Sequence, residues 1–533
     1  MLARTLGLVV CVLPLLAQGP IDPAGLPGTR ILGGGGKLPD RVYAEFLQLA
    51  GGPERARIVL IPTASGTADD ADGPAKALAR WQGAHPGFQF TVLHTRDRAT
   101  ADLESFVAPL QQATGVWFGG GVQKRLAEAY LGTRVEQEVQ AVLARGGVVG
   151  GTSAGTAIQT RTMIESGKEA PIVATGFDLV PHAISDQHFL QRQRLGRLQH
   201  VLAARPQHFG IGVDEGTAAI VGGRTLRVLG DSKVVLVLAG LPGDPGTVHE
   251  LAEGQQVDLV AWQRAAATRG KVPAAGTPRG EPKLAAGALL LVGGGRIPPA
   301  AIDRFVELAG GAAAKVVLIP SAMPADQRRE EPFARLLRQR GVTDLRTLDC
   351  AAPAEVTAER LAVLTDATAI WFGGGRQWRL CDAFDGTPAI AACHAVLARG
   401  GVIGGSSAGA TIQGDFLVRG NPLGNETMWA IGYDRGFGFL PGVAIDQHFV
   451  ARGREADLAT LIARLPRLLG LGIDEGTAAL VRGRELEVIG DSKLAVFDAR
   501  QRDPAAGEGP PVQPVWLSAG ARWDLVAGSR LER

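Results

Sequence analysis

Residues 148–155 read Val-Val-Gly-Gly-Thr-Ser-Ala-Gly, and residues 402–409 read Val-Ile-Gly-Gly-Ser-Ser-Ala-Gly. In both stretches a pair of β-branched residues runs into Gly-x-Ser-x-Gly, the pattern of a strand that turns sharply into a helix. The small residues around the serine permit the strained backbone of such a turn, and the serine hydroxyl is then exposed. The chain therefore contains the same strand–turn–helix unit twice.

The repetition extends outward from this unit through most of the chain. Matching pairs of stretches are 30–36 with 290–295, 57–62 with 315–320, and 116–121 with 370–375. Each is a short run of β-branched, aliphatic or aromatic residues that ends in Gly or Pro, which predicts buried parallel strands. Helical patterns such as residues 134–145 lie between them. The alternation predicts two tandem doubly wound, flavodoxin-like α/β domains with mostly parallel sheets, and active residues at the carboxyl ends of strands.

The length of 533 residues is ample for two domains. We expect a signal peptide over 1–19, a first domain over 20–264, a linker over 265–287 that is rich in Ala, Gly and Pro, and a second domain over 288–533. The two domains are expected to pack as a pseudo-symmetric pair.

The N-terminus has a basic Arg4, an apolar run over 6–16 and small residues suited to cleavage at 17–19. A buried strand or a membrane anchor is the alternative, but the run is short and Pro14 interrupts it. We therefore expect export to the periplasm or the medium, with no membrane segment in the mature chain.

Composition excludes several other classes of protein. A formal net charge of +2 gives no general case for nucleic-acid binding. Beyond the N-terminal segment the cysteines are Cys350, Cys381 and Cys393, and none is repeated in the first half. No His, Cys or Asp spacing suggests a ligand set. We expect neither a metal site nor an organic cofactor.

Two further polar motifs recur in the same order. Residues 186–189, Asp-Gln-His-Phe, return at 446–449, and the Asp-Glu-Gly-Thr-Ala that begins at Asp214 returns from Asp474. A serine becomes an effective nucleophile when a histidine takes its proton, and that histidine needs an orienting acceptor. The order Ser, His, carboxylate differs from that of ordinary α/β-hydrolases. The predicted catalytic residues are Ser153, His188, Glu215, Ser407, His448 and Glu475.

Alternatives to this interpretation remain open. Asp186 and Asp214 are rival acceptors for His188, and a glycine-rich turn can instead cradle a phosphate.

The backbone N–H after the serine and one in the Gly-Gly turn are expected to stabilise an oxyanion. The expected oxyanion residues are Gly120, Gly121 and Ala154, with Gly374, Gly375 and Ala408 in the second half.

Three arginines, at 192, 194 and 197, follow the first Asp-Gln-His motif with no acidic residue among them up to His200. Guanidinium groups without local partners can bind carboxylates in a bidentate manner, although a solvated basic helix face is the simpler alternative. In the second half Asp457 stands at the position of Arg197. A carboxylate there would repel an acidic substrate or neutralise a neighbouring arginine. We therefore expect the first site to be the better one, and the second to be weaker or tuned to another substrate.

Together these motifs resemble the cyanophycinases of peptidase family S51, which also contains aspartyl dipeptidase (peptidase E). The resemblance covers each half nearly end to end, as far as the Gly-Asp-Ser-Lys at 230–233 and at 490–493. It implies a class I glutamine amidotransferase-like fold with serine in place of cysteine. It also implies a serine exopeptidase that cleaves cyanophycin, a polyaspartate backbone bearing arginines, into β-aspartyl-arginine dipeptides.

The resemblance extends to individual residues. It makes Ser153 the nucleophile, His188 the base and Glu215 the acid. Val122 stands where the family usually has Asp. The implied substrate-binding residues are Gln123, Asp186, Gln187, Arg192, Arg194 and Arg197, with Gln377, Asp446, Gln447, Arg452 and Arg454 in the second half. The alternatives are an aspartyl dipeptidase, an amidotransferase-like hydrolase of unrelated substrate, and a secreted binding protein with idle Ser-His-Glu sets.

Overall fold

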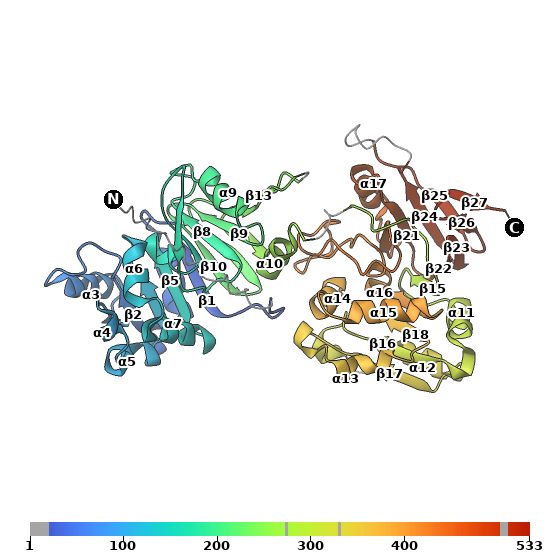
Figure 1. Ribbon diagram of the computed structural model, residues 1–533, viewed down its shortest axis with the longest axis horizontal. Coiled ribbons are helices and arrows are strands. Elements are labelled where there is room, and N and C mark those ends of the chain that lie inside the picture. The colour runs from blue at the N-terminus through green and yellow to red at the C-terminus, as the bar shows by residue number, and fades with distance from the viewer. Residues whose placement is uncertain (1–20, 243, 272–275, 329–331, 501–509, 533) are drawn as a thin grey trace, which may run out of the picture. The chain divides into compact units, whose positions relative to one another are not determined.

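The computed structural model describes residues 21–242, 244–271, 276–328, 332–500 and 510–532 (Figure 1). The predicted signal peptide at 1–19 lies outside this range. Within it, every sheet takes its strands from one repeat. None of the described helices combines the length and the apolar character needed to cross a bilayer.

In the described part of the first repeat the central sheet has eight strands, in the order β14-β11-β10-β1-β5-β4-β2-β3. The strands from β1 to β3 in this order are parallel, as predicted, whereas β11 and β14 are antiparallel. Their bounds are β1 Leu26–Gly33, β2 Arg57–Ile61, β3 Gln89–Val92, β4 Gly115–Phe118, β5 Val148–Thr152, β10 Thr217–Gly223, β11 Thr225–Gly230 and β14 Gln256–Asp258.

Helices cover both faces of this sheet, because side chains along a strand point alternately to its two faces. In β4, Trp117 packs edge-on against Phe46 of α1 with ring centroids 5.0 Å apart. Its neighbour Phe118 belongs to the opposite apolar core, which α5 and α7 complete. The helices of this repeat are α1 Asp40–Leu49, α2 Gly52–Arg55, α3 Gly73–Ala84, α4 Arg98–Ala101, α5 Glu104–Gln112, α6 Gln123–Tyr130, α7 Arg134–Ala144, α8 Ala154–Ala157, α9 Leu195–Ala203 and α10 Leu259–Thr268.

A smaller sheet in the order β13-β12-β9-β8 and a two-stranded hairpin, β6-β7, complete the repeat. Sequence patterns predicted one doubly wound sheet per half and did not predict this second sheet. Two of the predicted catalytic residues follow its strands, since His188 comes directly after β8 and Glu215 two residues after β9. The bounds are β6 Thr162–Ser166, β7 Ile172–Thr175, β8 Ala183–Gln187, β9 Phe209–Val213, β12 Val234–Leu238 and β13 Thr247–Leu251.

The second repeat has the same plan among its described residues. Its central sheet runs β17-β16-β18-β19-β15-β22-β23-β26-β27, and its smaller sheet runs β20-β21-β24-β25. Phe305 of α11 packs on Trp371 of β18 on one face, while Phe372 lies in the opposite core with α14 and α15. The strand bounds are β15 Ala288–Val292, β16 Lys315–Ile319, β17 Asp344–Thr347, β18 Ala369–Phe372, β19 Val402–Ser406, β20 Val443–Gln447, β21 Leu469–Ile473, β22 Thr477–Arg482, β23 Glu485–Gly490, β24 Lys493–Asp498, β25 Val515–Ser518, β26 Arg522–Asp524 and β27 Ser529–Leu531. The helices are α11 Pro299–Ala309, α12 Pro332–Arg338, α13 Ala358–Leu361, α14 Gln377–Phe384, α15 Ala389–Ala398, α16 Ala408–Thr411 and α17 Glu455–Arg464.

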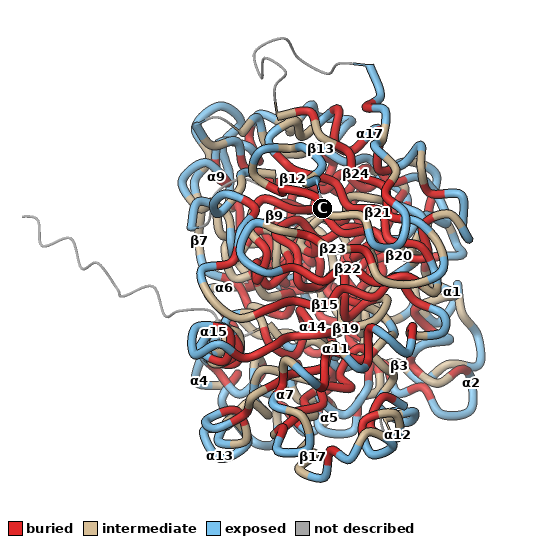
Figure 2. Tube along the Cα trace, turned by 90° about the vertical axis from the view of Figure 1, so that its right-hand side faces the viewer, coloured by how far each residue is buried: buried red, intermediate tan, exposed pale blue. Residues whose placement is uncertain are grey.

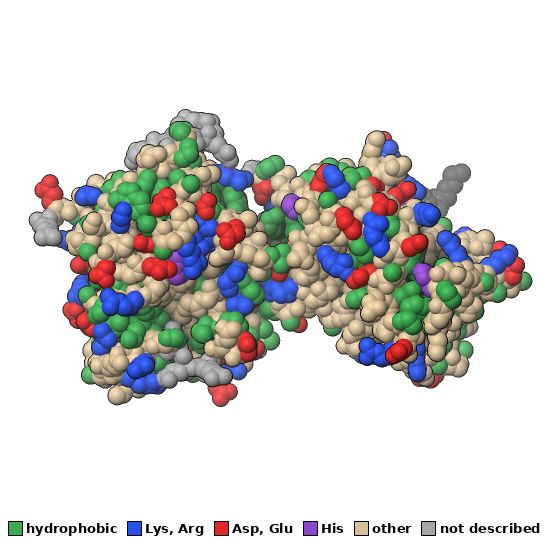
Figure 3. Space-filling model, turned by 180° about the vertical axis from the view of Figure 1, so that it is seen from behind, with side chains coloured by type: hydrophobic (Ala, Val, Ile, Leu, Met, Phe, Trp, Pro, Cys, Tyr) green, Lys and Arg blue, Asp and Glu red, His purple; other side chains and the backbone are tan. Residues whose placement is uncertain are grey.

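Figure 2 shows that buried residues follow the strands, while exposed residues lie on outer helices and loops. The parallel strand pairings in both central sheets confirm the prediction of two mostly parallel α/β domains. Basic and acidic side chains are interspersed over the face drawn in Figure 3, in keeping with the small net charge.

The predicted linker is partly structured. Its first four residues, 265–268, continue helix α10. Further on, the Arg279 backbone N–H donates to Asp415 Oδ2 at 2.7 Å, and the Leu284 N–H donates to the Gly483 carbonyl at 2.8 Å. The described residues from 276 to 287 therefore lie along the second repeat, although their composition alone indicated no core contact.

Candidate active site

Ser153 occupies the turn between β5 and α8 with φ +53° and ψ −110°. A non-glycine residue seldom adopts a positive φ, and such strain is typical of functional sites. The turn is closed by contacts that only glycines permit: a Cβ on Gly151 would lie 2.3 Å from the Gly155 carbonyl oxygen. Ser407 has the same geometry between β19 and α16, with φ +55°.

The serine, histidine and glutamate of the first repeat form one chain of hydrogen bonds. Ser153 Oγ lies 2.8 Å from His188 Nε2, and His188 Nδ1 lies 2.5 Å from Glu215 Oε1. With Nδ1–H donating to the carboxylate, Nε2 is left to accept the serine proton. The rival acceptor Asp214 instead accepts the Gln191 backbone N–H at 2.8 Å. Among the candidates, Glu215 is the carboxylate in contact with His188.

A glycine loop that follows β1 supports the His188 imidazole. The His188 N–H donates to the Gly34 carbonyl at 2.7 Å, and a Cβ on Gly35 would lie 2.2 Å from the ring Cε1. The sequence pattern indicated only the end of a strand at this loop. Its signal was the run of four glycines at 33–36, which has a counterpart at 293–295.

The environment favours the neutral form of His188. Burial lowers the pKa of His188 below its ordinary value, and the hydrogen bond to Glu215 opposes this effect. The cations Arg192 and Arg194 lower the pKa further. A neutral imidazole at neutral pH is the form that can act as a general base.

The second repeat brings the corresponding residues together. Ser407 Oγ lies 3.0 Å from His448 Nε2, and His448 Nδ1 contacts Glu475 Oε1. Gln447 Oε1 lies 3.4 Å from the same hydroxyl oxygen. Burial lowers the pKa of His448 as it does that of His188. Asp474, like Asp214, accepts backbone N–H groups instead of the histidine.

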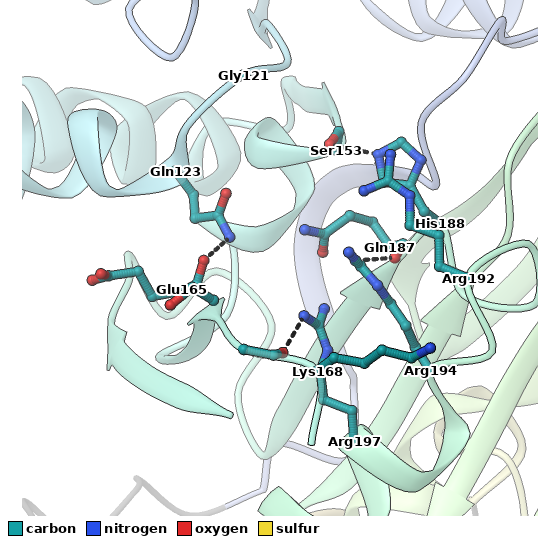
Figure 4. A pocket seen from close by; sticks show the side chains of 12 residues that line it. Gly121, Gln123, Ser153, Glu165, Lys168, Gln187, His188, Arg192, Arg194 and Arg197 are labelled. Atoms are coloured by element: carbon teal, nitrogen blue, oxygen red, sulfur yellow. Dashed lines mark hydrogen bonds between the residues drawn. The ribbon is translucent and has the colours of Figure 1, made fainter. Parts of the chain in front are cut away.

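A cavity of about 510 Å³ lies over the first triad (Figure 4). Ser153 and His188 form one side of it, and basic side chains form much of the rest. Its lining residues are Gly121, Gln123, Ser153, Glu165, Ser166, Gly167, Lys168, Gln187, His188, Arg192, Arg194 and Arg197.

The residues expected at the oxyanion lie around each serine. A Cβ on Gly120 would lie 3.7 Å from the Cβ of Ser153, and a Cβ on Gly374 would lie 3.7 Å from that of Ser407. Gly121 lines the cavity, and Gly375 has the same unusual φ of +141°. Ala154 and Ala408 begin the helices that follow the serines.

Two of the three arginines of the first cluster already have a partner. Asp186 is fully buried and receives Arg197 Nε at 2.8 Å and Arg194 Nη1 at 3.3 Å. The expectation that the arginines lack partners is therefore wrong for these two, and Asp186 lies beneath the cavity wall instead of in contact with a substrate. The sequence offered no sign of this pairing, because α9 is brought over β8 by tertiary packing. Within the described residues, the exposed Arg192 side chain has no hydrogen-bond or ion-pair partner.

Gln123 and Gln377 have a different role from Gln187 and Gln447. Gln123 lines the cavity, and its amide nitrogen donates to the carbonyls of Ile164 and Glu165 at 2.9 and 2.7 Å. Gln377 is buried and donates in the same way to Val418 and Arg419. These amides thus hold a wall of each site. Gln187 lines the first cavity beside the triad, and Gln447 contacts Ser407.

In the second repeat Asp446 is likewise buried, which makes direct substrate contact wrong for it too. Arg454 donates to it at 3.1 Å, and so does Arg419, a residue that sequence analysis missed. Arg419 also donates to Asp457 at 2.7 Å. Of the two roles considered for Asp457, neutralisation of a neighbouring arginine is the one present. Arg452 is exposed like Arg192, and no ion pair of its side chain occurs in the described ranges.

Comparisons with known proteins identify the family of the chain. The sequence model of peptidase family S51 matches residues 31–229 and again residues 289–489. The chain belongs to peptidase family S51. It is a serine-type peptidase built from two S51 repeats.

Curated relatives of this chain include several cyanophycinases. That of Geminocystis herdmanii is 32% identical over 203 residues, which cover 37% of this chain and 75% of the relative. That of Synechococcus elongatus is 36% identical over 206 residues, covering 37% of this chain and 63% of the relative.

Among solved structures, a peptidase from an acI-B1 Actinobacterium is 24% identical, with a TM-score of 0.37, over 44% of this chain and 98% of its own. Across the described residues no group of three or more His, Cys, Asp or Glu side chains is placed to hold a metal ion.

Proposed function

We propose that this S51 peptidase is an exported cyanophycin-degrading serine exopeptidase that releases β-aspartyl-arginine dipeptides. The observation that carries the proposal is the Ser153–His188–Glu215 hydrogen-bonded chain at one side of a cavity lined by Lys168 and Arg192. The similarity to cyanophycinases supports the choice of substrate.

The chemistry follows from the roles that the geometry allows. Ser153 Oγ attacks the scissile carbonyl while His188 Nε2 takes its proton, and Glu215 stabilises the resulting imidazolium. Backbone N–H groups of Ala154 and of Gly120 or Gly121 stabilise the oxyanion of the tetrahedral intermediate. His188 then protonates the leaving amine, and water releases the acyl group by the same steps in reverse order. In the second repeat Ser407, His448 and Glu475 would perform the same steps.

The charged groups of the cavity suit a polyaspartate backbone. Arg192 and Lys168 are exposed cations that can bind substrate carboxylates. Arg194 and Arg197 instead form ion pairs with the buried Asp186. A guanidinium binds a carboxylate in a bidentate manner more readily than an ammonium does. Arg192 is therefore the first substrate-binding residue we would assign in this site, and Arg452 its counterpart in the second.

Incubation of the purified protein with insoluble cyanophycin tests the proposal. We expect β-aspartyl-arginine, identified by chromatography and mass spectrometry, and no release from the Ser153→Ala/Ser407→Ala double variant. Cleavage of Asp-X dipeptides with the polymer left intact would instead indicate an aspartyl dipeptidase. Export is tested by the N-terminus of the mature protein, which we expect to begin near residue 20.

A further inference from the structure

The walls of the two sites carry opposite charges at two matching positions. Gln123 and Gln377 hold the backbone at Glu165 and at Arg419 by equivalent hydrogen bonds, so these two residues correspond. Arg197 and Asp457 correspond as well, because each lies nine residues after the catalytic histidine. The first repeat thus has the acidic Glu165 on the wall and the basic Arg197 on α9. The second has the basic Arg419 on the wall and the acidic Asp457 on α17.

After this exchange the buried aspartate of each repeat, Asp186 or Asp446, still has a second guanidinium in addition to that of Arg194 or Arg454. In the first it comes from Arg197, whose Nη1 also donates to the Gly167 carbonyl at 2.9 Å. In the second it comes from Arg419, which approaches from the opposite wall and donates to both oxygens of Asp446 at 3.1 Å. An unpaired buried carboxylate is costly, which explains why a guanidinium occurs in both repeats.

The charge balance around that aspartate nevertheless differs. In the first repeat two guanidiniums, Arg194 and Arg197, share the single carboxylate of Asp186. In the second repeat Arg419 and Arg454 face two carboxylates, since Asp457 joins Asp446. The ion-paired cluster beneath the first site therefore has one guanidinium more than it has carboxylates, whereas the cluster beneath the second is balanced. Glu165 also lines the first cavity, but within the described residues it forms no ion pair with that cluster.

Asp457 is placed to act on a substrate. Its side chain is 48% exposed, whereas Arg419, its partner, is 2% exposed. Its counterpart Arg197 lines the first cavity. We propose that Asp457 determines the specificity of the second site, which prefers a neutral or basic substrate side chain where the first site prefers an acidic one. This inference rests on the proposed peptidase activity of both sites.

Single-site forms test the proposal. Ser407→Ala leaves only the first site and Ser153→Ala only the second. Each is assayed on matched aspartyl peptides in which one side chain is Asp, Asn or Lys. We expect the ratio of kcat/KM for the Asp peptide over the Lys peptide to be about tenfold higher for the first site, because the second site has the exposed carboxylate of Asp457 where the first has the guanidinium of Arg197. The difference should shrink at high salt.

Asp457→Asn in the second-site form should raise the same ratio towards that of the first site, mainly through KM. Glu455→Gln on the same helix removes an equal charge and is the matched control, for which we expect no change. Circular dichroism checks that both variants fold. Equal ratios in the two single-site forms, or equal effects of the two substitutions, would overturn the proposal.

A fluorophosphonate probe separates this outcome from failure of the proposed function. Labelling of both serines together with equal substrate preference overturns only the specificity of Asp457. Absence of labelling at Ser407 overturns the inference, because the second site is then no peptidase. Absence of labelling at both serines overturns the proposed function as well.

Discussion

At the scale of single residues, the site depends on backbone conformations that few side chains tolerate. Ser153 and His188 both have positive φ values, of 53° each, and so do Ser407 and His448. Such conformations cost roughly 1–3 kcal/mol each and persist only when the surroundings enforce them. Gly35 is part of those surroundings, because the His188 ring occupies the space of its missing side chain.

Gly35→Ala should therefore inactivate the first site without unfolding the repeat. The new Cβ would lie 2.2 Å from the His188 ring and would displace the base from Ser153. We expect kcat of the Ser407→Ala form to fall at least about a hundredfold, the usual contribution of a general base. Gly146→Ala is the control, since Gly146 has a positive φ of 87° but no atom near a new Cβ. Equal losses in both variants would mean that backbone strain, and not the His188 contact, is responsible.

Arg192 should set the pH at which the first site becomes active. Its positive charge disfavours protonation of His188 and so lowers the pKa of that group. The base works when neutral, so kcat/KM should rise with pH through a pKa below about 6.5, the ordinary value. Arg192→Ala removes the cation, and the acid limb should then move to higher pH. In the same Ser407→Ala form, Arg452→Ala is the control and should leave the acid limb of the kcat/KM profile unchanged, because Arg452 belongs to the other site. A shift of the acid limb in Arg452→Ala would contradict this explanation.

At the scale of elements, the largest difference between the repeats is the wall beside the triad. The first repeat has the β6–β7 hairpin there, whereas the second has a longer segment between Gln413 and Pro441 with one isolated bridge from Phe416 to Arg435 in its described residues. Arg376 anchors this segment through bonds to the carbonyls of Asn421 and Gly424 at 2.7 and 2.8 Å. Val122 occupies the matching position of the first repeat and is 47% exposed.

Arg376→Ala should loosen the loop at 421–424. Loss of two charge-assisted hydrogen bonds, each worth roughly 1.5–3 kcal/mol, removes its anchor to helix α14. We expect amide hydrogen exchange in this loop to accelerate at least about tenfold, measured by mass spectrometry. Val122→Ala provides the control in the first repeat, where exchange of the β6–β7 hairpin should not change. An unaltered rate at 421–424 would show that other contacts hold the loop.

At the scale of the whole molecule, the chain carries two complete Ser-His-Glu sets. The distances from serine to histidine are 2.8 Å in the first repeat and 3.0 Å in the second. Burial lowers the pKa of the histidine in both. The two sites differ in the residues and charges of their walls and not in these distances. We therefore expect both serines to be reactive and the two sites to prefer different substrates.

A serine-directed fluorophosphonate probe should label two sites per chain. Each activated serine is a nucleophile towards such a probe because its histidine accepts the proton. We expect intact mass spectrometry to detect two adducts on the native chain, one on Ser153→Ala or Ser407→Ala, and none on the double variant. Persistent labelling of the double variant would assign the reaction to another residue.

Much of this site could be predicted from local sequence. The elbow at Ser153 depends on small residues within four positions of it, and the strand patterns and repeated motifs predicted the fold class. Short-range steric rules act between neighbours in the chain, so they are visible in the sequence. The repetition of Asp-Gln-His also singled out His188, but it left Asp186 and Asp214 as rivals of Glu215 until the distance to His188 was known.

The charge pattern of the walls was decided only by the tertiary structure. Asp186 was expected at the substrate, but it is buried under Arg197. Arg419 stands where the first repeat has Glu165, yet it performs for Asp446 what Arg197 performs for Asp186. A buried carboxylate requires a cation within bonding distance, whichever segment supplies it. The sequence by itself determined the repeated fold and the reactive groups, and tertiary packing decided which charges remain free for a substrate.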